Sequence, residues 1–266
     1  MKELKLWKYI FDKISYDIDV VLLIVANASS ASPGRTGFKM AVADDGTSIG
    51  TIGGGIMEFN IVTEIKSSFN NKAKMSFVRK LHHSNLANGD KSGLICGGVQ
   101  TVVFKSLAKE HIQTISKIII SLEKTETGVL SITENELSFS PNRLNLKDIS
   151  LSLGEGNNWI FEENIGIPNT VYIVGGGHVG LAVSRIMLTL DFNVVVFDHR
   201  TKIGTMDENI FAHKKIITPY SEIHNYIIEG KKSFVVIVTP SHDGDKDALQ
   251  SVLNLDLKYI GSMGSA

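Results

Sequence analysis

The sequence has little cysteine, no excess of either charge and no long apolar run, and each shortage excludes a class of protein. Cys96 is the only cysteine among 266 residues, so neither a disulfide within the chain nor a four-cysteine zinc site can form. The chain carries 27 basic and 28 acidic side chains, a balance that gives no field to attract nucleic acid or an anionic membrane. Small molecules or proteins are therefore the expected partners.

No segment near the start has the pattern of a membrane span or a signal peptide. The longest apolar run there, Val20–Ala26, is far shorter than the roughly 20 residues that a helix needs to cross a bilayer. Acidic residues precede this run, whereas a signal peptide begins with a positively charged region. Together with the single cysteine, this pattern predicts a cytoplasmic protein with no membrane partner.

The stretch Val171–Gly180 has the pattern of a dinucleotide-binding turn. A run of β-branched and aromatic residues predicts a strand, and Gly175, Gly177 and Gly180 follow at the spacing G-x-G-x-x-G. In that motif the glycines permit a tight turn, a close approach of backbone to a pyrophosphate, and close packing of the next helix on the strand. Amides at the start of that helix favour a phosphate. A glycine-rich turn without a ligand is the alternative.

The helix after this turn is expected to have one apolar face. Apolar residues recur there at helical spacing and are expected to lie on the sheet: Val179, Val183, Ile186, Met187 and Leu190. The next strand, Asn193–Phe197, ends at Asp198, 23 positions after Gly175. Ribose hydroxyls are usually held by an acid at this place, so NAD(P) is an expected ligand, and charge repulsion at Asp198 would favour NAD over NADP.

The first part of the chain predicts a mixed arrangement of helices and strands. The expected elements are a helix within residues 1–16, a strand at Val20–Ala28, a hairpin of Met40–Ala43 with Ser48–Thr51, a helix after Gly53–Gly55, a strand at Val99–Phe104 and a helix over Lys109–Glu123. Between Thr127 and Asn164, short strand-like pieces alternate with turn residues. A domain boundary is expected at the end of this tract.

Strand and helix patterns alternate after the boundary, as a parallel sheet requires. The expected strands are Thr170–Val174, Asn193–Phe197, Lys215–Ile217, Phe234–Val238 and Tyr259–Ile260. The predicted fold class is therefore α/β, with a C-terminal Rossmann-like parallel-sheet domain over residues 165–266. A smaller mixed α/β (α+β) domain, assigned to residues 1–164, is expected to precede it.

Four motifs, in order along nearly the whole chain, resemble the XdhC/CoxI family, accessory factors of molybdenum hydroxylases such as xanthine dehydrogenase. The segment Ser32–Met40 resembles a loop of small residues that leads into a strand, and Gly50–Glu58 resembles a triple-glycine turn followed by a glutamate. The third motif is Cys96–Gly98. The fourth is the glycine turn with His178, followed by Asp198 and Arg200.

The resemblance implies a function, a cofactor and partners. Members are understood to bind the molybdenum cofactor, as molybdopterin or its dinucleotide form, and to assist its sulfuration and insertion. The implied partners are a hydroxylase of the xanthine dehydrogenase type and a cysteine desulfurase, and the implied assembly is a homodimer. The protein is thereby expected to be a cofactor-insertion chaperone more than a turnover enzyme.

The resemblance also implies a set of site residues. The expected cofactor-binding positions are Gly53, Gly54, Gly55, Glu58, Cys96, Gly97, Gly98, Gly175, Gly177, His178, Gly180, Asp198 and Arg200. Cys96 is in addition the expected catalytic residue and metal ligand, since a thiolate is a good ligand for molybdenum or a persulfide. The Cys96 loop and the two glycine turns are expected to converge on one cleft between the domains.

Several of these residues also have a purely structural interpretation. Cys96 fits equally a buried cysteine that acts as a small apolar residue, and His178 fits a residue that only completes the turn. His82 and His83 are interpreted as a solvated loop. The acids after His242 fail the calcium-loop pattern, and the helix dipole alone explains acids in a first helical turn.

Two departures from the family pattern affect these expectations. Pro240 stands where relatives usually have the first of two histidines, which leaves only His242 and puts any role of that pair in doubt. Relatives generally continue beyond the position of Ala266, so a truncated chain or a short variant is expected.

Two other function classes remain open. An NAD(P)-dependent oxidoreductase is supported by the glycine turn and Asp198, although no convincing proton-transfer residue can be named. The second is a nucleotide-sensing module that only regulates its partner.

Overall fold

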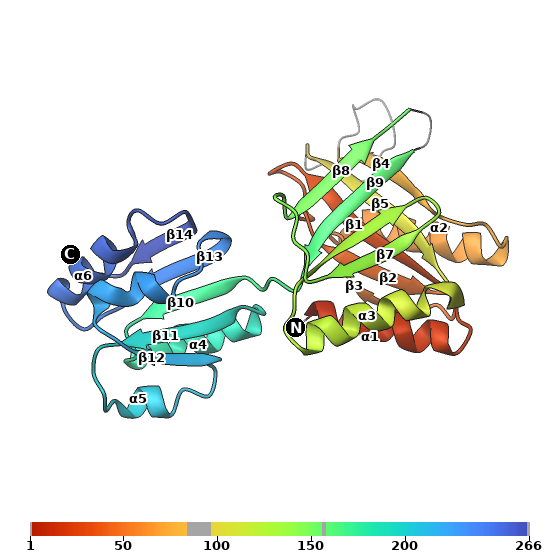
Figure 1. Cartoon of the computed structure of the whole chain (residues 1–266). Coiled ribbons are helices and arrows are strands. Elements are labelled where there is room, and N and C mark those ends of the chain that lie inside the picture. Colours follow the sequence, from red (N-terminus) through yellow and green to blue (C-terminus); the bar gives the residue numbers. More distant parts are fainter. Residues whose placement is uncertain (1, 84–96, 156–157, 265–266) are drawn as a thin grey trace. The chain divides into compact units, whose positions relative to one another are not determined.

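The computed structural model describes residues 2–83, 97–155 and 158–264 (Figure 1). The chain divides into two compact units, Met1–Gly166 and Ile167–Ala266. The expectation of a smaller N-terminal domain is wrong, because the N-terminal unit contains two sheets and the C-terminal unit one. None of the helices in the described ranges is long and apolar enough to cross a membrane.

The first sheet of the N-terminal unit is antiparallel and has the order β3-β2-β1-β5-β4. Its strands are β1 (Val20–Ala28), β2 (Lys39–Ala43), β3 (Ser48–Gly50), β4 (Phe77–His82) and β5 (Val99–Leu107). Strand β1 is buried over most of its length because both faces of the sheet are covered. Val20, Leu22 and Ile24 join one hydrophobic cluster, and the alternating residues Val21 and Leu23 join the other. The predicted strand at residues 20–28 and the predicted hairpin are thus confirmed.

The second sheet and two helices complete one of these clusters. The sheet has the order β7-β6-β9-β8, and the helices α1 and α3 lie side by side (Figure 1). The elements are α1 (Lys2–Ser15), the 3-10 turn η1 (Lys109–His111), α3 (Ile112–Glu123), β6 (Gly128–Thr133), β7 (Leu137–Pro141), β8 (Ile149–Leu153) and β9 (Trp159–Ile165). Helix α2 (Gly55–Asn70) supplies Met57, Ile61 and Ile65 to the other cluster.

A largely buried lysine joins the two sheets. The Lys39 Nζ atom on β2 lies 2.7 Å from a carboxylate oxygen of Glu163 on β9 and 2.9 Å from one of Glu3 on α1. Burial lowers the pKa of Lys39, but the two carboxylates raise it by more, so the net shift is upward. The charge is therefore kept inside the unit by its partners.

The C-terminal unit is a parallel sheet of order β12-β11-β10-β13-β14. Its elements are β10 (Thr170–Val174), α4 (His178–Thr189), β11 (Asn193–Asp198), α5 (Gly204–Asp207), β12 (Lys214–Ile217), η2 (Tyr220–Tyr226), β13 (Gly230–Ile237), α6 (His242–Val252) and β14 (Leu257–Ser262). The five predicted strands and the Rossmann-like class are confirmed. The strand order reverses at β10, the place where open α/β sheets bind ligands beyond the carboxyl ends of their strands.

The apolar stripe of α4 meets the sheet along only one side. Val183 and Met187 pack against the sheet as predicted. Three other members are exposed, against the prediction: Val179 at 45%, Ile186 at 58% and Leu190 at 54%. The buried positions of the helix are Gly180 and Ser184. Their small side chains let the helix backbone approach β10 closely, and this contact turns part of the stripe to solvent.

Candidate functional site

Two of the three glycines in the Rossmann turn are required by the fold itself. A Cβ on Gly175 would lie 2.4 Å from the Val238 carbonyl oxygen, and this residue has a φ of +119°, which side chains disfavour. A Cβ on Gly180 would lie 1.9 Å from the Gly175 carbonyl oxygen. The first glycine therefore shapes the turn, and the third sets the close contact of α4 with β10.

Gly177 has no such neighbour. No other part of the described protein comes within 4 Å of the position that its Cβ would take, and its φ of −73° suits any residue. Gly177 caps the start of α4, where the first amides of a helix have no partner within the helix. The structure thus leaves open space at the place where a phosphate is favoured.

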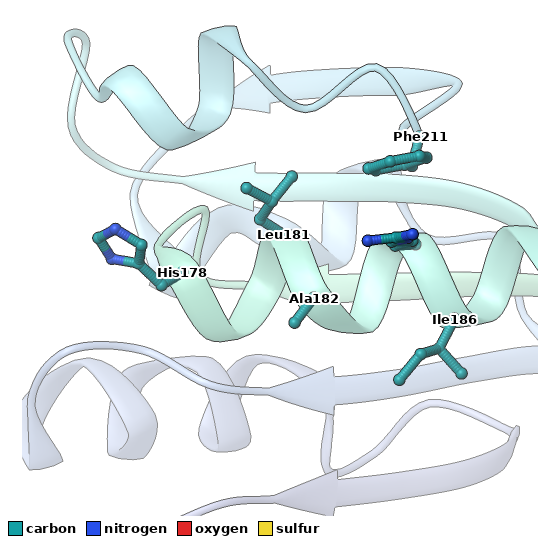
Figure 2. Close-up of a pocket in the computed structure, with 6 residues that line it drawn as sticks. His178, Leu181, Ala182, Ile186 and Phe211 are labelled. Atoms are coloured by element: carbon teal, nitrogen blue, oxygen red, sulfur yellow. The ribbon is translucent and has the colours of Figure 1, made fainter.

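A shallow pocket of about 550 Å³ runs along α4 (Figure 2). Figure 2 shows exposed His178 at the start of the helix, and Phe211 facing the helix from the segment before β12. Leu181, Ala182 and Ile186 line the pocket with them, as does Arg185, whose guanidinium lies over the Phe211 ring at 6.0 Å. The lining is mostly apolar and offers few polar groups to orient a ligand, so this pocket is a poorer candidate than the turn itself.

Asp198, at the end of β11, is fully buried and occupied by protein donors. Its Oδ2 atom accepts hydrogen bonds from the Gly176 amide at 2.8 Å and from the Arg200 Nη2 atom at 3.0 Å. Its Oδ1 atom accepts from the Arg200 amide and the Arg200 Nε atom, each at 3.0 Å. Burial raises the pKa of Asp198, but hydrogen bonds from Arg200 and Gly176 lower it by more, and the net shift is downward.

These bonds change the role of Asp198. A carboxylate has about four lone-pair sites, and four protein donors take them here. The expectation that Asp198 accepts a ribose hydroxyl does not fit this geometry, because a ribose would have to displace a protein donor. Asp198 instead holds the glycine turn through Gly176 and fixes Arg200 beside it.

Residues that the sequence did not single out complete the turn. The Thr205 hydroxyl donates to the Gly176 carbonyl oxygen at 2.6 Å, and a Cβ on Gly176 would lie 2.9 Å from the Met206 sulfur. Burial, followed by the charge of Asp198, raises the pKa of Tyr220. The short helix α5, which contains Thr205 and Met206, therefore lies against the turn, a contact that no local sequence pattern signals.

The glycine motifs of the N-terminal unit come together in a second cluster. A Cβ on Gly53 would lie 2.7 Å from the Gly34 amide nitrogen, and a Cβ on Gly98 would lie 2.7 Å from the Ser32 amide nitrogen. The loop between β1 and β2 therefore touches both the turn before α2 and the start of β5. Three of the four family-like motifs meet at one place in this unit.

Glu58 holds the triple-glycine turn. Its Oε2 atom accepts from the Thr51 hydroxyl at 2.6 Å and from the amides of Ile52 and Gly54, each at 3.0 Å. The values of φ at Gly53, Gly54 and Gly55 are +135°, +76° and +70°. The carboxylate thus occupies the amide-rich start of α2 and holds the turn in place. The expectation that Glu58 itself binds the cofactor stays a prediction.

Gly97 and Gly98 are anchored by His83, the residue directly after β4. The Gly97 amide donates to the His83 carbonyl oxygen at 2.8 Å, and the His83 amide donates to the Gly98 carbonyl oxygen at 2.9 Å. Beside them the buried Gln100 side chain donates through Nε2 to the Ile52 carbonyl oxygen at 2.7 Å. Gly97 has a φ of +74°, and none of the described residues comes within 4 Å of the position of its missing Cβ.

His83 corrects an expectation. The side chain of His83 is fully buried and His82 ends β4, so the interpretation of this pair as a solvated loop is wrong. Burial lowers the pKa of His83 more than the nearby Gln100 raises it. Pairing of β4 with β5 includes His82, and backbone hydrogen bonds to Gly97 and Gly98 hold His83 directly after the strand; these long-range contacts have no local signal.

Cys96 lies outside the described residues, directly before Gly97. Its expected role as ligand and catalytic residue stays a prediction, as does the expectation that the N-terminal cluster and the Rossmann turn share one cleft. In the described ranges, no group of three or more His, Cys, Asp or Glu residues has the arrangement of a metal site.

Hydrogen bonds within the protein hold the start of α6. Ser241 caps the helix by accepting a hydrogen bond from the Gly244 amide, and Asp245 accepts one from the Thr239 hydroxyl.

The parallel sheet and its glycine turn define a protein with a Rossmann-type domain. Residues 171–266 match the family model described as the XdhC Rossmann domain, and residues 16–79 match the model described as the XdhC and CoxI family. The two models match in the expected order and together span more than half of the chain. The chain belongs to the XdhC/CoxI family.

A solved structure shares the fold. It is a crystal structure described as a xanthine dehydrogenase from Bacillus halodurans, and it is similar with a TM-score of 0.58 and 18% sequence identity. The match covers 100% of this chain and 82% of the other chain. No protein with a curated description matches the sequence.

Proposed function

We propose that this protein is an accessory factor that binds the molybdenum cofactor and assists its sulfuration and insertion into a hydroxylase of the xanthine dehydrogenase type. A cysteine desulfurase would supply the sulfur, and two copies of the chain would form the working unit. The family assignment supports the accessory role.

The observation that carries the proposal is the meeting of three glycine motifs in the N-terminal unit. No described atom lies within 4 Å of the place where a Cβ on Gly54 or Gly97 would stand, so with respect to the described residues a ligand can approach the backbone closely at either position. Glu58 and Gln100 fix the two segments by hydrogen bonds to the backbone. Backbone held by such hydrogen bonds, with no described side chain at Gly54 or Gly97, would suit a planar ligand such as a pterin.

Each unit is given its own part in binding. Cys96, next to Gly97, would hold the metal end through its thiolate, a soft ligand suited to molybdenum. The turn at Gly177 would hold a phosphate. When bound, the cofactor would supply the redox-active metal that the partner hydroxylase uses.

A cysteine substitution tests the proposal. Cys96→Ser changes one atom, and Cys96→Ala removes the polar group as well. We expect both variants to fold as wild type, to retain several-fold less molybdenum on purification and to activate a partner hydroxylase poorly in a mixed assay. Molybdenum content by mass spectrometry and hydroxylase activity are the measurements. A cysteine-free protein that retains and delivers the cofactor like wild type would refute the mechanism.

An NAD(P)-dependent oxidoreductase is the second candidate, and the open space at Gly177 favours it. The groups around the turn favour it less. Asp198 is occupied by Arg200 and Gly176, and burial raises the pKa of Tyr220 away from the range of a general base. Hydride transfer from NADH or NADPH to an acceptor, measured on the purified chain, separates this candidate from the accessory role.

A further inference from the structure

The end of β11 presents a cation to a ligand of the Rossmann turn, where many such sites present an acid. Asp198 has a fully buried side chain and its lone pairs are taken by Gly176 and Arg200. The side chain of Arg200 is 40% exposed. The guanidinium, and not the carboxylate, is therefore the accessible charged group of this pair.

Arg200 retains hydrogen-bonding capacity toward such a group. A guanidinium has five N–H donors in a fixed fork, and Asp198 takes one from Nε and one from Nη2. Three donors, two of them on Nη1, remain on the edge away from Asp198. The pair with Asp198 holds the fork in one orientation, so little side-chain entropy is lost when an anion binds.

The position of Arg200 decides which part of a nucleotide it meets. In a Rossmann domain the pyrophosphate lies at the start of the first helix, and the adenosine ribose lies at the end of the second strand. Here these places are Gly177 and the end of β11. A guanidinium at the second place suits a phosphate on the ribose 2′-oxygen, whereas an accessible carboxylate there would suit a free hydroxyl.

We propose that Arg200 is the specificity-determining residue of the Rossmann turn, and that it selects a 2′-phosphorylated nucleotide of the NADP class over NAD. Asp198 acts as a positioning residue that orients Arg200 and the turn together. This inference rests on the part of the proposed function in which the turn at Gly177 binds a phosphate-bearing ligand.

Calorimetric titration of the full chain with NADP⁺ and with NAD⁺ tests the inference. We expect wild type to bind NADP⁺ about tenfold more tightly than NAD⁺, since a hydrogen bond to a charged group contributes on this scale. Arg200→Gln is expected to lose the preference for NADP⁺, because the glutamine amide offers no positive charge to a 2′-phosphate. Lys258→Gln, which removes an exposed positive charge at the start of β14, away from the carboxyl ends of the strands, is expected to keep the preference.

Equal affinities in wild type, a preference for NAD⁺, or no binding of either nucleotide would overturn the inference. Circular dichroism checks the fold of Arg200→Gln, and if that variant is unfolded, Arg200→Lys provides the second test. Arg200→Lys keeps the charge but loses the fork, so we expect a reduced preference for NADP⁺. The molybdenum content of the same wild-type preparation reports the proposed function separately, so the two can fail independently.

Discussion

The three glycines of the Rossmann turn are glycine for different reasons. Gly175 and Gly180 face the protein's own carbonyl oxygens, whereas Gly177 faces open space. The absence of a side chain at Gly175 and Gly180 is therefore needed for stability, whereas its absence at Gly177 gives a ligand access to the backbone.

Substitutions at Gly177 and Gly180 are expected to separate these properties. Gly177→Val should abolish nucleotide or cofactor binding and leave the melting temperature close to that of wild type, because its Cβ meets no described atom and its φ is ordinary. Gly180→Ala should destabilise the unit by about 1–3 kcal/mol, since its Cβ would overlap a backbone oxygen. Calorimetric binding and thermal unfolding measure the two effects. Unchanged affinity in Gly177→Val would make the turn purely structural.

At this scale the sequence predicted positions better than roles. It placed Asp198 at a strand end beside the glycine turn, and the structure confirms that position. It did not predict that Arg200, two residues later, donates hydrogen bonds to both oxygens of the Asp198 carboxylate. The direction of a buried carboxylate depends on the packing of its neighbours, and no local pattern contains that information.

Among the elements, strands of β-branched residues were the most predictable and helix faces the least. Strands β1 and β10 begin and end at the expected residues. In α4 the apolar residues cover more of the helix surface than the sheet can bury. Close contact with the sheet through Gly180 and Ser184 determines which of them are exposed. Strand β4 was not predicted, because its charged Arg79 and Lys80 suit an edge strand whose pairing comes from the distant β5.

Neighbouring positions of α4 are expected to respond differently to the same substitution. Ile186→Gln should change the free energy of unfolding by no more than about 0.5 kcal/mol, because this side chain is 58% exposed. Met187→Gln should cost about 1–2 kcal/mol, because Met187 packs against the sheet. Urea unfolding of the two variants gives both values. A larger loss in Ile186→Gln would mean that its exposed surface is covered in solution.

At the scale of the whole molecule, each unit has its own core, and the N-terminal one depends on a buried charge. Lys39 connects β2 of the first sheet with β9 of the second, which lie far apart in the sequence. The sequence predicted strand-like pieces between Thr127 and Asn164 but not their order in a sheet, because strand order depends on pairing between distant segments.

Removing one partner of this pair should destabilise the N-terminal unit strongly. Lys39→Met leaves the carboxylate of Glu163 buried without its cation, and a loss of about 3 kcal/mol is expected. The double change Lys39→Met with Glu163→Leu should recover most of that loss, since no charge is then buried at this contact. Differential scanning calorimetry measures the transitions. Lys231→Met, which breaks an exposed pair with Asp256, is the control and should leave them unchanged. Additive losses in the double variant would count against a coupled pair.

The two tryptophans of the chain provide a spectroscopic consequence of this organisation. Trp7 and Trp159 are buried in one cluster of the N-terminal unit, and residues 167–266 contain none. Intrinsic fluorescence excited at the indole band therefore reports the N-terminal unit alone. A change in far-ultraviolet circular dichroism without a change in tryptophan emission therefore reports a change in the Rossmann domain. A quenching titration with cofactor would sense only ligands that reach or reshape the first unit, so the unlabelled protein distinguishes by light which half of the chain a ligand affects.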